Sequence, residues 1–140
     1  MPVILAPPGS GKTYWVQSHP EWHDMDILYC PKYHSLTWSK REHKRKETIE
    51  RHYTAIDEVV EKDRLSKNIV GSLFWKLVPD AIVILDERLH RRYVKSRSGA
   101  EVLPWENAER IRNVLLDVAK EHKVPVFNSF DQAAAHVNTV

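Results

Sequence analysis

The chain has 140 residues, 42% of them hydrophobic, and a formal net charge of +2. This length gives one domain with a single sizeable core and leaves no room for an added regulatory domain. The small positive charge suits a protein that handles anionic small molecules, and it does not require nucleic acid as a partner. Cys30 is the one cysteine, so an internal disulfide is excluded and a reducing cytoplasm is the expected compartment.

The first predicted element is a short core strand, Val3-Ile4-Leu5, which leaves no space for a signal peptide. Nor does any apolar run approach the roughly 18 residues of a membrane-spanning helix, so we expect no membrane partner. A glycine-rich loop follows the strand, and residues 14–17 can then begin a helix. The loop reads Ala6-Pro7-Pro8-Gly9-Ser10-Gly11-Lys12-Thr13. It fits the phosphate-binding P-loop, with Ala in place of the usual first Gly, in the strand–loop–helix context that this motif requires.

The P-loop predicts a phosphate site with ATP and Mg²⁺ as cofactors. Glycines let the loop curl until its backbone N–H groups point at phosphate oxygens, and the helix N-terminus adds partial positive charge. We expect Lys12 to reach the β- and γ-phosphates and the Thr13 hydroxyl to ligate Mg²⁺. The predicted nucleotide-binding residues are Pro8, Gly9, Ser10, Gly11, Lys12 and Thr13.

The remaining elements alternate along the chain. Proline disfavours helical geometry in the residue before it, so Pro20 is predicted to end the first helix. A second strand is expected at 24–29, followed by a long amphipathic helix from a capping box at Ser39 to about residue 64. Further strands are predicted at 68–72, 81–85 and 124–127, and further helices after Pro104 and from a cap at Asp131.

This order, β-α-β-α-β-β-α-β-α, has strands too apolar to face water and therefore predicts an α/β fold of three layers. We predict a P-loop NTPase fold, with a mainly parallel sheet of about five strands flanked by helices. The whole of residues 1–140 is expected to form a single domain.

Three features together resemble the small P-loop kinases: the P-loop near the N-terminus, the downstream sequence Asp24-Met25-Asp26, and an arginine-rich stretch after a strong strand. This family includes nucleoside monophosphate kinases, shikimate and gluconate kinases, and phage or viral nucleotide kinases. The short chain most resembles the reduced phage and viral members, which would place it in the host cytoplasm. The resemblance implies an ATP- and Mg²⁺-dependent phosphotransferase that moves the γ-phosphoryl group to a nucleotide-like acceptor.

The resemblance also implies roles for the two aspartates. In kinases that carry Asp-x-Asp after the second strand, one carboxylate serves the Mg²⁺ shell and the other holds or deprotonates the acceptor hydroxyl. Carried over residue by residue, Asp24 is assigned to the metal side and Asp26 to the acceptor. A carboxylate suits this place because the attacking hydroxyl needs orientation and a proton acceptor. The alternative is a turn or helix-capping pair.

A second acidic pair, Asp86-Glu87, follows a continuous apolar strand, which is how many P-loop ATPases present the aspartate that binds Mg²⁺. Glu87 would then polarise a water. In the small kinases, however, the strand before the lid often ends in an Asp that is not the metal ligand. The metal strand would then be 68–72, which lacks a carboxylate. Asp86 is therefore either a Mg²⁺ ligand or a structural cap.

The stretch from Arg88 to Arg97 is rich in basic side chains. It could close over ATP as a lid, with guanidinium groups that neutralise the charge on the transferring phosphoryl group and exclude water. Arg92 and Arg97 are the candidate arginines, and Lys12 and Asp26 complete the predicted catalytic residues. The alternative is a solvated helix end with ordinary positive charges.

Residues 39–46 form a basic helix start, which we interpret as a solvated face with internal ion pairs. The alternative is a contact to the phosphates of an anionic acceptor or of DNA. Two rival functions therefore stay open beside the nucleotide kinase. One is a kinase that acts on a modified base in DNA. The other is an ATPase module that works through a partner protein, which Asp86-Glu87 would favour if it is a metal-and-water pair.

Overall fold

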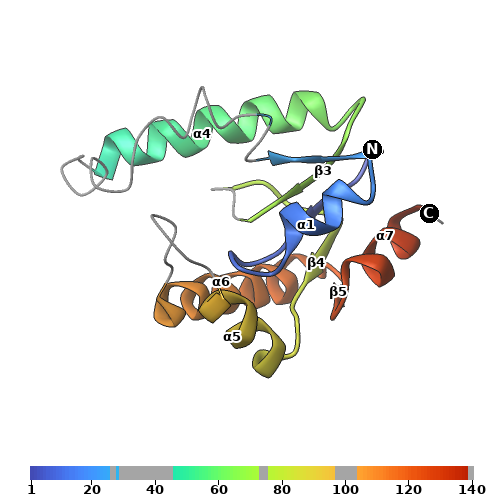
Figure 1. Cartoon of the computed structure of the whole chain (residues 1–140). Helices are drawn as coiled ribbons and strands as arrows, with labels where there is room; N and C mark the ends of the chain where they lie inside the picture. The colour runs from blue at the N-terminus through green and yellow to red at the C-terminus, as the bar shows by residue number, and fades with distance from the viewer. Residues whose placement is uncertain (26–27, 29–45, 73–75, 97–103, 139–140) are drawn as a thin grey trace.

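Figure 1 shows the chain as a computed structural model, which describes residues 1–25, 28, 46–72, 76–96 and 104–138. The described strands form one sheet in the order β2-β3-β1-β4-β5, and every neighbouring pair is parallel. The strands are β1 (Val3–Leu5), β2 (Trp22–Asp24), β3 (Asn68–Gly71), β4 (Ala81–Val83) and β5 (Val126–Phe127). The helices are α1 (Lys12–Gln17), α4 (Lys46–Asp63), α5 (Glu87–Ser96), α6 (Trp105–His122) and α7 (Phe130–Asn138).

Helices cover both faces of the sheet. Side chains alternate along a strand, so Val3 and Leu5 of β1 join one core cluster with side chains of α4 and α6. Ile4 points to the other face, where its cluster includes side chains of α1 and α7. The run from 81 to 85 is buried throughout because both faces are covered. The predicted α/β architecture, with five parallel strands flanked by helices, is confirmed.

The second strand begins earlier and is shorter than predicted. The expected range is 24–29, whereas β2 covers Trp22–Asp24 and Met25 and Leu28 are helical. Trp22 donates its backbone N–H to His19 O at 2.9 Å, so the strand follows directly on the turn. The buried Trp22 side chain, 2% exposed, anchors the strand in the core. Asp24 therefore ends this strand, at the carboxyl edge of the sheet.

The start of α7 also differs from the prediction. Ser129, rather than Asp131, caps this helix: its Oγ accepts the backbone N–H of Gln132 at 3.2 Å, and the helix begins at residue 130. Asp131 instead accepts a hydrogen bond from Trp15 Nε1 at 2.8 Å, which ties α7 to α1. A hydroxyl one residue before the helix is in the better position to cap it.

The other predicted elements are present with small shifts of their ends, and α5 is a helix that the predicted order lacks. Helix α6 begins directly after Pro104 as predicted. β3 and β4 lie within the predicted ranges 68–72 and 81–85. The long helix predicted from Ser39 is present as α4 in its second part, and its predicted start lies outside the described residues. No helix in the described part of the chain is long and apolar enough to cross a membrane.

Candidate functional site

The loop between β1 and α1 has a conformation that requires its glycines. Gly9 and Gly11 have φ angles of 79° and 81°, a left-handed region that other residues rarely adopt. A Cβ added to Gly9 would lie 2.5 Å from Val94 Cγ2, so contact also excludes a side chain there. Ser10 is buried and donates its hydroxyl to Pro7 O at 2.6 Å, which closes the turn. The strand–loop–helix context expected for the motif is therefore present.

Lys12, Thr13 and Asp24 come together at the carboxyl edge of the sheet. β1 and β2 belong to one parallel sheet, so the loop after β1 and the end of β2 lie at the same edge. Thr13 Oγ1 donates to Asp24 Oδ2 at 2.7 Å, and Lys12 Nζ lies 3.9 Å from Asp24 Oδ1. Asp24 and Lys12 are buried, at 2% and 8% exposure, whereas Thr13 is exposed. We call these three residues the P-loop cluster.

Burial gives the P-loop cluster its chemical character. A charged group removed from water is costly unless an opposite charge or a hydrogen-bond donor compensates it. The Asp24 carboxyl group has both kinds of partner, the Lys12 amino group and the Thr13 hydroxyl. The cluster therefore provides a basic and an acidic group side by side at the start of α1, where an anion and a cation can bind together.

The donor set of the P-loop cluster fits Mg²⁺. This ion prefers oxygen ligands and is usually held by one or two carboxylates, substrate phosphates and water. The exposed Thr13 hydroxyl donates a hydrogen bond to Asp24, so the lone pairs of its oxygen remain for a cation. Among the described residues, no group of three or more His, Cys, Asp or Glu side chains could hold a metal ion. A cation held by Thr13 and Asp24 would therefore depend on the phosphates of a bound nucleotide.

Helix α5 packs directly against the P-loop, a contact that no pattern in the sequence indicates. His90 is fully buried, and its Nε2 lies 2.9 Å from Pro8 O. A ring carbon of Tyr93 lies 3.4 Å from the position that a Cβ of Gly11 would occupy. Burial lowers the pKa of His90 below its ordinary value, and the nearby Arg112 lowers it further against the raising effect of the bond to Pro8. The α5 side of the loop is thus closed by packed side chains.

Asp86 caps helix α5. Its Oδ1 accepts the backbone N–H groups of Arg88 at 3.1 Å and Leu89 at 3.4 Å. Glu87 lies 3.7 Å from Arg91 Nε, one turn further along the helix. Of the two alternatives for Asp86, the structure contains the cap, and its role as a Mg²⁺ ligand stays a prediction.

Of the two predicted catalytic arginines, only Arg92 lies in the described part of the chain, and it faces away from the P-loop cluster. An α-helix turns by about 200° over two residues. Arg92 is therefore on the side of α5 opposite to His90 and Val94, which face the P-loop, and it is exposed. Asp26 and Arg97 lie outside the described residues, so their predicted roles as acceptor base and lid arginine stay predictions.

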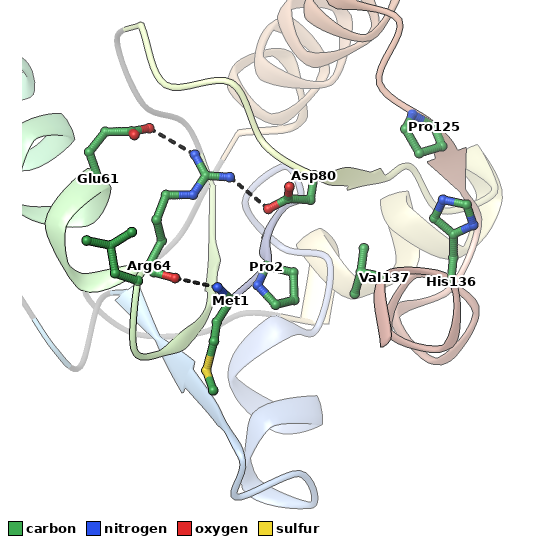
Figure 2. A pocket seen from close by; sticks show the side chains of 9 residues that line it. Met1, Pro2, Glu61, Arg64, Asp80, Pro125, His136 and Val137 are labelled. Carbon is green, nitrogen blue, oxygen red and sulfur yellow. Dashed lines mark hydrogen bonds and ion pairs between the residues drawn. The ribbon is translucent and has the colours of Figure 1, made fainter. Parts of the chain in front are cut away.

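A second polar region lies at the opposite, amino edge of the sheet (Figure 2). Arg64 Nη2 lies 2.7 Å from Asp80 Oδ2, Arg64 Nη1 lies 2.9 Å from Glu61 Oε1, and the Met1 amino group donates to Arg64 O at 2.6 Å. Asp80 also accepts the backbone N–H of Val3 at 2.7 Å. These groups bind one another, so we interpret them as a structural clasp, the amino-edge clasp. The clasp borders an open cavity of about 550 Å³ that is lined by Met1, Pro2, Arg64, Asp80, Pro125 and His136.

No protein-family model matches this chain, and a search of curated proteins finds no significant match. The functional conclusion therefore depends on the residues and geometry of the site.

Proposed function

We propose that the chain is an ATP- and Mg²⁺-dependent P-loop kinase that transfers the γ-phosphoryl group of ATP to a nucleotide-like acceptor. The observation that carries this proposal is the P-loop cluster, in which Thr13 and Lys12 of the loop meet the buried Asp24 at distances of 2.7 and 3.9 Å. Phosphoryl transfer depends almost entirely on positioning and on charge stabilisation, and these are the properties that such a cluster provides.

The loop and the start of α1 would bind the phosphates of ATP. Backbone N–H groups at a helix N-terminus favour anions, and the two positive-φ glycines let the backbone approach closely. Lys12 Nζ would move from Asp24 toward the β- and γ-phosphates, where a fixed positive charge stabilises charge that builds up during transfer. A bound Mg²⁺ would supply further neutralisation of the phosphate oxygens.

Asp24 would act on the donor side of the reaction. Its Oδ2 accepts a hydrogen bond from the Thr13 hydroxyl, and this bond would orient the hydroxyl oxygen toward a cation. The acceptor hydroxyl needs a separate proton acceptor, the role predicted for Asp26. Asp24 itself is already bonded to two groups of the P-loop cluster, so a division of labour between the two carboxylates is the arrangement that we favour.

The ATPase alternative has less support than the kinase. It depends on Asp86 and Glu87 as a metal-and-water pair, whereas Asp86 caps α5 and Glu87 lies 3.7 Å from Arg91. Both carboxylates thus have structural roles in α5 that explain their presence. The kinase requires neither of them.

Product analysis with γ-labelled ATP tests this function. The wild-type chain would be incubated with Mg²⁺ and a panel of nucleoside monophosphates and modified-base DNA, and free phosphate would be separated from labelled acceptor. We expect label on a nucleotide acceptor, and about 10²-fold less or lower still with Lys12→Ala. Lys120→Ala, which changes an exposed lysine on α6, serves as the matched control and should behave as wild type. Label found entirely in free phosphate would contradict the kinase and favour the ATPase module.

A further inference from the structure

We propose that His90 is a positioning residue for the P-loop: its Nε2–H donates to the carbonyl oxygen of Pro8 and thereby directs the Gly9 N–H toward a bound phosphate. This inference rests on the proposed function, because it concerns the loop that would bind ATP. It adds a residue that lies 82 positions from Pro8 in the chain and on a different element, α5.

The neighbours of His90 determine which ring nitrogen carries the proton. Arg112 Nη1 lies 3.3 Å from His90 Nδ1 and also donates to Leu85 O at 2.6 Å. A guanidinium group has donors and no acceptor, so Nδ1 must be the accepting nitrogen. The proton of the neutral ring is therefore on Nε2, which lies 2.9 Å from Pro8 O. The hydrogen bond to the P-loop follows from this assignment.

Helix α6 holds the His90 ring in this orientation. The Trp105 ring lies edge-on to it, with centroids 5.0 Å apart and an interplanar angle of 79°. Trp105 is fixed in turn by a 3.1 Å hydrogen bond from Nε1 to Glu109 and by Arg91, whose guanidinium lies 4.5 Å from the indole centroid. The imidazole therefore has one packed orientation, and its donor points at the loop.

The bond to Pro8 controls the peptide group that joins Pro8 to Gly9. A trans peptide is planar, with its C=O and N–H pointing in opposite directions. A carbonyl held on His90 therefore turns the Gly9 N–H away from α5. Val94 lies on the α5 side of Gly9, with its Cγ2 2.5 Å from the position of an added Cβ, so it obstructs a phosphate on that side. Gly9 itself, with φ 79° and no Cβ, would rotate easily without such a restraint.

A buried imidazole needs a partner for each ring nitrogen, because its polar atoms are removed from water. His90 has one partner on the P-loop and one on Arg112. Its 0% exposure means that water cannot replace either bond. Because one of these bonds ends on the loop itself, His90 ties the position of Pro8 O to the packed helix α5.

Two substitutions test the donor separately from the volume of the side chain. His90→Leu keeps a side chain of similar size but has no donor, whereas His90→Gln offers an NH2 group as donor and a carbonyl oxygen as acceptor, in place of the N–H and the accepting nitrogen of the neutral imidazole. Calorimetric titration with Mg²⁺–ATP gives the dissociation constant and the fraction of competent protein separately. A merely structural defect lowers the competent fraction and leaves the dissociation constant unchanged.

We expect His90→Leu to raise the dissociation constant for Mg²⁺–ATP about tenfold, the usual worth of a hydrogen bond to a charged group, and His90→Gln to restore most of the affinity. An unchanged constant in His90→Leu, or an equal loss in both variants, would overturn the proposal. Wild type and Lys12→Ala in the same titration test the proposed function. If wild type does not bind Mg²⁺–ATP, the proposed function is wrong. If wild type binds and His90→Leu has no effect, only the role of His90 is rejected.

A measurement on the wild-type chain keeps the proposal testable if His90→Leu does not fold. Nitrogen-15 NMR of the histidine rings identifies the protonated nitrogen of each neutral imidazole. A proton on His90 Nε2 supports the proposal, and a proton on Nδ1 overturns it.

Discussion

Each edge of the parallel sheet carries a cluster in which an aspartate pairs with a basic side chain, but the basic residue and the exposure of its neighbours differ between the two. At the carboxyl edge, Asp24 bonds to Lys12 and Thr13 beside a glycine loop, and Thr13 is exposed. At the amino edge, Asp80 bonds to Arg64, whose guanidinium also reaches another carboxylate and a backbone carbonyl. Arginine satisfies several fixed partners at once, whereas lysine is a single mobile charge on a flexible stem. We propose that the first cluster exchanges its partners for a ligand, whereas the second links α4, the start of β1 and the start of β4.

The largest expected effect is at the carboxyl edge. Lys12→Ala removes the ammonium group that would stabilise the negative charge on the transferring phosphoryl group. Turnover should therefore fall by about 10²-fold or more. The fold should remain, since Asp24 keeps its bond to Thr13. A coupled assay for turnover and circular dichroism for the fold check this. Equal turnover in wild type and variant would mean that the P-loop cluster is structural, like the clasp.

Asp24→Asn should have the next largest effect. The amide keeps the shape of the carboxyl group but loses its charge and part of its capacity to accept the Thr13 proton. We expect the Mg²⁺ concentration for half-maximal turnover to rise about tenfold, the low end of the effect of losing an outer-shell partner. Asp117→Asn changes an exposed carboxyl group on α6 and is the matched control. A Mg²⁺ requirement that stays at the wild-type level would remove Asp24 from the metal side.

Arg64→Met should separate the two edges most clearly. It removes the guanidinium bonds to Asp80, Glu61 and Val78 O but keeps most of the side-chain volume. The free energy of unfolding should fall by about 1 kcal/mol, because the ion pairs are partly exposed. The dissociation constant for Mg²⁺–ATP should not change. Weakened nucleotide binding in stable Arg64→Met protein would show that the amino-edge clasp takes part in function.

The smallest effect concerns pH. Burial lowers the pKa of His90 in the folded chain, so the folded state binds its proton less readily than the unfolded state. The contribution of His90 to stability is therefore complete above the unfolded pKa of about 6.5 and is lost as pH falls through the lowered folded pKa. The charged group beside the His90 ring is Arg112 on α6, whose Nη1 lies 3.3 Å from His90 Nδ1. Arg91 on α5 and Glu109 on α6 contact Trp105, which packs edge-on against the ring, and Glu87 on α5 lies 3.7 Å from Arg91.

Urea unfolding of wild type and His90→Gln at about pH 7.5 and about pH 5.5 measures this contribution. Wild type should lose more stability on acidification than the variant, which has no titrating group at this position. Identical losses in the two proteins would show that His90 is not held neutral by the fold.

The parts of the site that sequence reasoning predicts are contiguous in the chain. Lys12 and Thr13 belong to one motif, and its strand and helix follow from the neighbouring residues. The role of Asp24 is implied by the resemblance to small P-loop kinases, whereas the predicted strand begins at Asp24, the residue at which β2 ends. Trp22 is buried in the core and begins β2, a tertiary effect that local β-propensity does not contain.

The contacts that sequence reasoning missed join residues far apart in the chain. His90 reaches Pro8, and Arg64 reaches Asp80, through packing that depends on the final arrangement of helices. Basic side chains dominate residues 88–97 and therefore predict a lid. The buried residues of α5 are His90 and Val94, which lie one helical turn apart. Asp86 is the local signal for this helix, and the sequence alone is consistent with either a metal ligand or a cap at this position.

Hydrogen–deuterium exchange with and without Mg²⁺ and a non-hydrolysable ATP analogue tests the contrast between the two edges most directly. We expect slower exchange at the backbone amides of residues 9–15 when the analogue binds, because phosphate oxygens would engage these N–H groups. Residues 61–65 and 78–81 at the amino edge should exchange at the same rate in both states. Protection at the amino edge with none in the P-loop, or no protection anywhere in wild-type protein, would contradict this contrast.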